Sequence, residues 1–386
     1  MKGNDIIMNE TKNGITHKKR NQTFAYLYVM AIIMVIDDHC STRIGFLSSI
    51  FPYNSFYMPL FVFASGYFFK RMGILDNVKY KVKKLLIPYV IWNIVALVVA
   101  FMLDRIFLID WFKMPTTESI VRMFLNGSST SVNGAAWFVI MLFWVSIFYN
   151  ILKNLFKDNK FTDTILTIFF IITGFISIYL CTQGYNAKGL FWLFILKTTF
   201  YIQFFHYGFM FKKHFEKLLL KHRKILVCII CIFINGLLIL IFGDKINFYS
   251  TSGMGGFNYW YLPLITSFTG IIFYYEIMEF LSKKIGRVKI IDFISRNTFV
   301  ILETHLLFVN IPNFYVYLKI LQGSTLYSDF NLNAFINNAW VRYSPDTRLI
   351  GFCCGLIFSL LTAFLIEKVK KYISNRKLSK QNLIEE

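Results

Sequence analysis

The chain has 386 residues, of which 56% are hydrophobic, and its formal net charge is +20. A soluble domain this apolar would be hard to keep dispersed, and a charge this basic would normally suggest nucleic-acid binding. Here the basic residues form short clusters between long apolar segments, which is the positive-inside pattern of polytopic membrane proteins. The sequence therefore predicts a lipid bilayer as its surroundings and no nucleic-acid partner.

The apolar segments are long enough, or nearly so, to cross a hydrocarbon core of roughly 30 Å as helices. We predict an all-α membrane bundle with ten transmembrane helices near residues 23–41, 53–69, 86–104, 135–152, 163–181, 190–211, 224–242, 257–280, 297–316 and 346–367. Residues 23–367 then form one membrane domain. A basic tail, residues 1–22, precedes this domain, and a second tail, residues 368–386, follows it.

The distribution of basic residues sets the orientation of the bundle. With the N-terminus inside, 31 of the 41 Lys and Arg residues fall in inner segments. An even number of spans keeps this alternation, so both termini are predicted to be cytoplasmic. The longest outer loop, near residues 317–345, is expected to pack over the mouth of the bundle.

The first predicted span ends in the sequence Asp37-Asp38-His39. His39 lies about 25 Å along a helix that starts on the cytoplasmic side, just below the outer surface. An imidazole can take up a proton near physiological pH, which suits a general base. The alternative is that these three residues are simply the solvated end of a span.

The ninth predicted span contains Glu303 and His305 near the middle of the membrane. A charged side chain there costs at least ~2.5–3.5 kcal/mol on insertion scales, so it suggests a function. Glu303, His305 and Asp38 are candidates to orient His39 or to line a path to it. The alternative is a structural pairing with a polar group of another span. Such polar residues imply an internal cavity, which an enzyme, a transporter or a receptor could each contain.

Several motifs occur in a fixed order along the chain. The first span closes on His39, and residues 56–68 read FYMPLFVFASGYF. Residues 81–92 read KVKKLLIPYVIW, residues 136–139 read AWFV, and residues 295–305 read SRNTFVILETH. Together they resemble the acyltransferase-3 family of membrane proteins, which includes O-acetyltransferases of bacterial surface polysaccharides and fucose-4-O-acetylase-like proteins.

Four positions in or near these motifs matter for the chemistry. The family often has an Arg eleven residues before the first-span histidine, where this chain has Tyr28. Its paired arginines before the third span correspond here to Lys81 and Lys84, which keep the charge but not the bidentate fork. For Ser65, which precedes Gly66, we favour close packing of helix backbones over a nucleophile.

The resemblance implies an O-acyltransferase that takes an acyl group from acyl-CoA. We predict transfer of acetyl from acetyl-CoA to a hydroxyl of a cell-surface or lipid-linked glycan at the bacterial plasma membrane, with His39 as general base. Lys81 and Lys84 would contact the donor phosphates, although topology and anionic lipids also explain this basic cluster. No metal-spaced set of ligands and no Gly-rich nucleotide loop occurs in the sequence.

Two questions stay open at this point. The alternative function is a proton-coupled transporter of a glycan or small molecule that uses the intramembrane His and Glu residues. For the enzyme, His39 is near the outer face whereas acetyl-CoA is cytoplasmic. Either the pantetheine arm of the donor threads into the bundle, or the acyl group crosses by a relay.

Overall fold

The computed structural model describes residues 21–40, 47–127, 132–216, 224–246, 253–341 and 347–385, and these contain helices and no strands. The prediction of an all-α bundle is confirmed. The first twenty residues of the predicted N-terminal tail, with Lys18, Lys19 and Arg20, lie outside the described residues.

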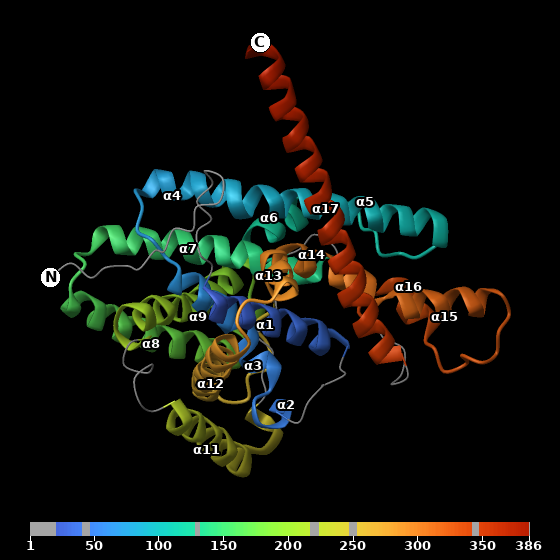
Figure 1. The fold of residues 1–386 in the computed structure, drawn as a ribbon. Helices are drawn as coiled ribbons and strands as arrows, with labels where there is room; N and C mark the ends of the chain where they lie inside the picture. Colours follow the sequence, from blue (N-terminus) through green and yellow to red (C-terminus); the bar gives the residue numbers. More distant parts are fainter. Residues whose placement is uncertain are drawn as a thin grey trace.

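Each of the ten apolar segments falls on a helix or on two consecutive helices. They are α1 (Gln22–Cys40), α3 (Tyr53–Tyr67), α4 (Ile74–Lys81) joined through the π-helical η1 (Val82–Leu86) to α5 (Ile87–Phe107), α7 (Trp137–Leu155), α8 (Lys160–Thr182), α9 (Leu190–Met210), α11 (Lys224–Phe242), α12 (Leu262–Ile285), α14 (Thr298–Val309) with α15 (Ile311–Leu321), and α17 (Arg348–Glu385). Figure 1 shows their arrangement.

Shorter helices connect these elements. They are α2 (Leu47–Ile50), α6 (Thr117–Leu125), α13 (Lys289–Arg296), α16 (Leu332–Asn337), the 3₁₀ turns η2 (Gly134–Ala136), η3 (Tyr185–Ala187) and η5 (Gly243–Ile246), and the π-helical η4 (Phe211–Phe215).

Eight of the helical segments in the described part of the chain are long and apolar enough to cross a membrane. The exceptions among the ten predicted spans are α3 and α9. Helix α3 has only 15 residues, and it packs along α9 inside the bundle. A helix surrounded by protein needs neither the length nor the hydropathy of a lipid-facing one, so the count of ten spans stays a prediction.

Two glycines bring α3 and α9 into backbone contact. A Cβ atom at Gly66 would lie 1.8 Å from the carbonyl oxygen of Phe205, and one at Gly208 would lie 1.9 Å from that of Phe63. The two helices therefore cross with no side chain between their backbones at either glycine, as small residues permit in membrane bundles. This confirms the packing role that we favoured for the Ser65-Gly66 pair.

The outer helices present apolar side chains away from the bundle. Helix α11 lies at one edge of the molecule in Figure 1, and most of its apolar residues are exposed, among them Ile229, Phe233 and Leu240. Helices α1, α7 and α12 are mostly buried instead. Exposed apolar surface of this kind is stable only against lipid, which agrees with a membrane bundle.

An ion-pair cluster fixes the ends of α7, α8 and α9 relative to one another. Lys153 and Asp163 are fully buried, and their charged atoms are 3.0 Å apart. Lys213 lies 2.7 Å from both Asp163 and Asp158, and its hydrogen bond holds the pKa of the Asp158 carboxyl below its usual range. The cluster joins two of the segments that were predicted to be cytoplasmic.

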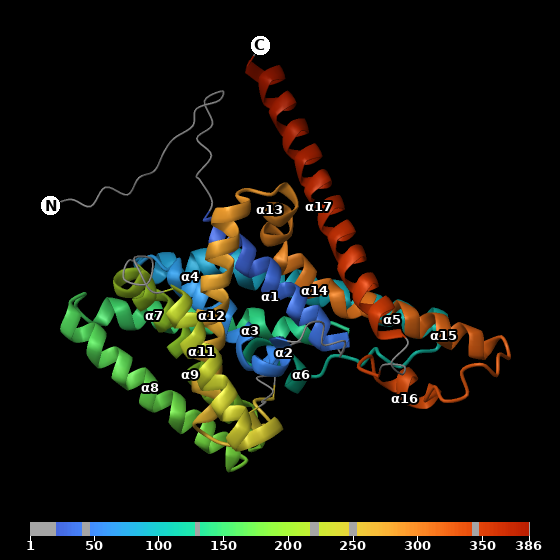
Figure 2. The same cartoon turned by 60° about the horizontal axis from the view of Figure 1, so that its bottom comes forward.

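Helix α17 continues well past the bundle (Figures 1 and 2). The segment predicted as a tail from Lys368 is a continuation of this helix as far as Glu385. Its side chains from Lys368 to Arg376 are exposed. The cytoplasmic location of this segment stays a prediction.

We expect the substitution Gly208→Ala to destabilise the bundle by ~1–3 kcal/mol, because its Cβ would overlap the backbone of α3. Gly236→Ala in α11 is the matched control, since nothing lies within 4 Å of its Cβ position. Thermal unfolding in detergent, followed by size-exclusion chromatography, measures both. An unchanged melting temperature for Gly208→Ala would contradict the backbone contact.

Candidate functional site

Two histidines from helices far apart in sequence meet inside the bundle. His39 lies in the last turn of α1, and His305 lies in α14 and is fully buried. The Nε2 atom of His305 is 3.3 Å from the Nδ1 atom of His39, and the ring centroids are 5.0 Å apart. Of the residues predicted to lie near His39, His305 is the one that the structure places against its ring from another helix.

Backbone carbonyls indicate the tautomer of each ring. The Nδ1 atom of His39 is 2.6 Å from the carbonyl oxygen of Val35, and that of His305 is 3.0 Å from the carbonyl oxygen of Ile301. A carbonyl only accepts hydrogen bonds, so we assign the proton to Nδ1 in both rings. The His39 N–H then also points to Nε2 of His305, and Nε2 of His39 is the basic nitrogen.

Asp38 is directed to a neighbouring helix. Its Oδ2 atom accepts a hydrogen bond of 2.9 Å from the hydroxyl of Tyr57 in α3. Sequence reasoning did not single out Tyr57, although it lies in the second motif. The sequence could have indicated this contact. Two consecutive antiparallel spans place residue 38, near the end of the first, and residue 57, near the start of the second, at the same depth in the membrane.

Glu303 lies on a different face of α14 from His305, as their spacing of two residues requires. It is only 5% exposed, and neither carboxylate oxygen forms a hydrogen bond with a described group. It therefore does not hydrogen-bond His39. The side-chain amide of Asn133, just before η2, is a polar neighbour of this carboxylate.

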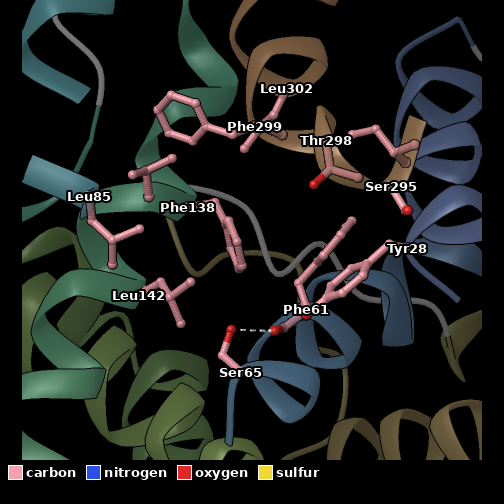
Figure 3. Close-up of a pocket in the computed structure, with 12 residues that line it drawn as sticks. Tyr28, Phe61, Ser65, Leu85, Phe138, Leu142, Ser295, Thr298, Phe299 and Leu302 are labelled. Carbon is pink, nitrogen blue, oxygen red and sulfur yellow. Dashed lines mark hydrogen bonds between the residues drawn. The ribbon is translucent and has the colours of Figure 1, made fainter. Parts of the chain in front are cut away.

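A cavity of about 310 Å³ lies between α1, α3, η1, α7, α13 and α14 (Figure 3). Its lining is mostly apolar, with four hydroxyl groups. The lining residues are Tyr28, Ile32, Phe61, Ser65, Leu85, Phe138, Val139, Leu142, Ser295, Thr298, Phe299 and Leu302. On α14 it extends to Leu302, about 4.5 Å of helical rise before His305. On α1 it begins at Tyr28, roughly 16 Å before His39.

Two lining residues bear on earlier predictions. Tyr28, which stands where the family often has Arg, stacks on Phe61 with their ring centroids 5.8 Å apart. Ser65 donates a hydrogen bond of 2.9 Å to the carbonyl oxygen of Phe61, drawn in Figure 3. A serine bonded to its own helix is a packing and lining residue here, which fits the reading that we favoured.

Lys81 and Lys84, the lysines predicted to contact the donor, come shortly before a cavity-lining residue in the sequence. Lys81 ends α4, and Lys84 lies in η1 directly before the lining residue Leu85. Lys84 is exposed, and Lys81 is partly buried. The π-helical turn thus presents Leu85 to the cavity and a basic side chain to its surroundings.

The predicted outer loop contributes a residue that the sequence did not reveal. The indole ring of Trp340, between α16 and α17, lies 5.5 Å from the ring of His39. No periodicity or motif pointed to this tryptophan, because it stands in an irregular segment.

Comparison with known proteins agrees with this geometry. The family model Acyl_transf_3, described as an acyltransferase domain, matches residues 25–369. The chain belongs to the acyltransferase-3 family. Searches of curated proteins and of solved structures gave no significant match.

Family membership and the apolar helices together indicate a membrane acyltransferase. The match spans the complete cavity and both histidines. It supports an acyltransferase rather than the transporter that the intramembrane His and Glu residues had left open.

With His39 as the expected general base, His305→Ala should lower kcat for acyl transfer by ~10–100-fold with little change in KM, because His305 contacts His39 and is not among the residues that line the cavity. His305→Gln should recover part of kcat, since its amide oxygen can accept the His39 N–H. Steady-state kinetics of the purified full chain in nanodiscs measures both.

The matched control is Thr304→Ala, which removes a buried hydrogen bond to Ser359 from the same helix. Equal losses in the Thr304 and His305 variants would show that His305 acts only through stability.

Proposed function

We propose that this protein transfers an acetyl group from acetyl-CoA to a hydroxyl of a cell-surface or lipid-linked glycan at the bacterial plasma membrane. His39 is the general base of this reaction, and His305 positions it. The observation that carries the proposal is the pairing of the two imidazoles close to the end of a mostly apolar cavity, within a chain of the acyltransferase-3 family.

The tautomer assignment gives His39 a defined role. Nε2 of His39 removes the proton of the acceptor hydroxyl as its oxygen attacks the thioester carbonyl carbon. The imidazolium that forms keeps its Nδ1–H directed at Nε2 of His305, which stabilises it. The C–S bond then breaks, and His39 returns the proton to the leaving thiolate. The products are an ester and CoA.

The cavity supports threading of the donor arm over a relay of acyl groups. It runs along α1 and α14 toward the two histidines from the side where the basic residues predict the cytoplasm. A volume of about 310 Å³ is at the lower end of ligand pockets, which suits a thin arm with a short acyl group. The hydroxyl groups of Tyr28, Ser295 and Thr298 can pair with the amides of the pantetheine arm.

In this arrangement the nucleotide part of acetyl-CoA stays outside the bundle. Lys84, next to the lining residue Leu85, and Lys81 would contact its phosphates. A lysine ammonium acts as a point charge. Its contacts with the phosphates would strengthen binding of the donor but would not fix the orientation of the phosphates. Positions 28 and 61 supply an aromatic wall to the cavity.

His39→Ala should lower acetylation of the surface glycan by ~10²–10⁴-fold, the usual value for loss of a general base. The measurement is mass spectrometry of surface glycan from a deletion strain that expresses each variant. Ser65→Ala is the control, because it removes the alternative nucleophile but keeps the cavity open; it should retain activity.

Glycan that carries the same acyl groups with wild type and with His39→Ala would overturn the assignment of the base. Glycan that has the same mass with and without the gene would overturn the proposed function itself. The mass difference also identifies the acyl group.

A further inference from the structure

Trp340 lies beside the paired histidines and is still partly exposed. The residue is 43% exposed, although its ring centroid is only 5.5 Å from that of His39. His305 lies against His39 as well, with centroids 5.0 Å apart. An aromatic surface thus adjoins the base, away from the cavity that ends near Leu302.

Two buried asparagines hold the backbone on both sides of this tryptophan. Asn310, at the break between α14 and α15, donates 3.0 Å to the carbonyl oxygen of Ala339. Asn313 donates 3.3 Å to the carbonyl oxygen of Val341. Both asparagines are at most 2% exposed. The segment is therefore fixed to the same helix pair that carries His305.

A glycine fixes the indole from a third direction. A Cβ atom at Gly134 would lie 2.3 Å from Cζ2 of Trp340, so the edge of the ring rests directly on the backbone before α7. Any side chain at this position would displace the indole. The ring is held by α14–α15, by η2 and by His39, and it is ordered before any ligand binds.

We propose that Trp340 is a stacking platform for a sugar ring of the acceptor and that it places one hydroxyl of that ring next to His39. The inference rests on the proposed function and specifies its acceptor subsite. One face of a pyranose presents C–H groups whose hydrogens carry partial positive charge. The face of the indole ring carries the negative part of its quadrupole, so it attracts these C–H groups. The hydroxyls at the rim of the sugar then point sideways, toward the neighbouring imidazole of His39.

A competing explanation is that Trp340 is one of the tryptophans that membrane proteins place at the lipid interface. Trp260, before α12, offers a direct comparison. It is 44% exposed, and its ring packs on Phe175 and Tyr261 with no histidine involved. An interfacial role predicts similar effects for both tryptophans, whereas the platform predicts an effect for Trp340 alone.

The test uses the full chain in nanodiscs, radiolabelled acetyl-CoA, and surface glycan extracted from a strain without the gene. Trp340→Leu keeps an apolar side chain but removes the ring face. It should raise KM for this glycan about tenfold, with KM for acetyl-CoA within about twofold of wild type. Trp340→Tyr should recover most of the affinity, because it restores an aromatic face.

Gly134→Ala provides a second variant that leaves Trp340 itself intact. By pushing the indole away, it should raise KM for the glycan in the same way. Trp260→Leu is the matched control and should behave as wild type.

Three results would overturn the platform. One is an unchanged glycan KM in Trp340→Leu while His39→Ala abolishes transfer, which leaves the proposed function standing. Another is an equal effect of Trp260→Leu. The third is a loss in Trp340→Leu that Trp340→Tyr does not recover and that also changes KM for acetyl-CoA. Failure of the wild-type protein to acetylate the glycan at all would instead overturn the proposed function.

Discussion

The contact between the imidazoles of His39 and His305 fixes the position of α1 relative to α14 at the level of the candidate site. Polar groups inside a membrane bundle must find partners within the protein, because lipid offers none. Each ring meets this need twice, through a carbonyl of its own helix and through the other ring. His39 is therefore held by two helices at once. Trp340 lies against His39, and the cavity reaches Leu302, three residues before His305.

The fold relates the distribution of basic residues to the proposed path of the acyl donor. In the proposed account, the basic clusters mark the face where acetyl-CoA is available, and the histidine pair lies toward the other face. The cavity, lined by Tyr28 and Ile32 of α1 and by Leu302 of α14, lies between them. In the account proposed above, the donor arm rather than a relay of acyl groups crosses the inner half of the bundle, and the acceptor approaches from the side of Trp340.

Helical segments were predictable from the sequence because apolar length is a local property. All ten predicted segments coincide with helices, and the apolar-to-basic transition at Lys368 was visible, although α17 continues through it. His39 and His305 were identified because a titratable group in a span is costly. Their pairing was not predictable, since residue spacing gives the face of a helix but not its neighbour.

Other features of the site depend on tertiary contacts that leave no local pattern. Trp340 stands in an irregular segment, and its place follows from hydrogen bonds of Asn310 and Asn313 to that segment. The direction of Glu303 toward Asn133 likewise depends on how α14 is rotated. The short helix α3 crosses α9 at Gly66 and Gly208. The sequence showed only the small residues of α3 and did not show that α9 is the helix they pack against.

The most direct test of the account is a cryo-electron-microscopy structure of the full chain in nanodiscs with a thioether analogue of acetyl-CoA, which cannot transfer its acyl group. The account predicts density for the pantetheine arm in the cavity between Tyr28 and Leu302. Its acyl carbonyl should lie next to Nε2 of His39, with room for an acceptor oxygen ~3–3.5 Å from the carbonyl carbon. An arm bound outside this cavity, or an acyl end directed away from His39, would contradict it.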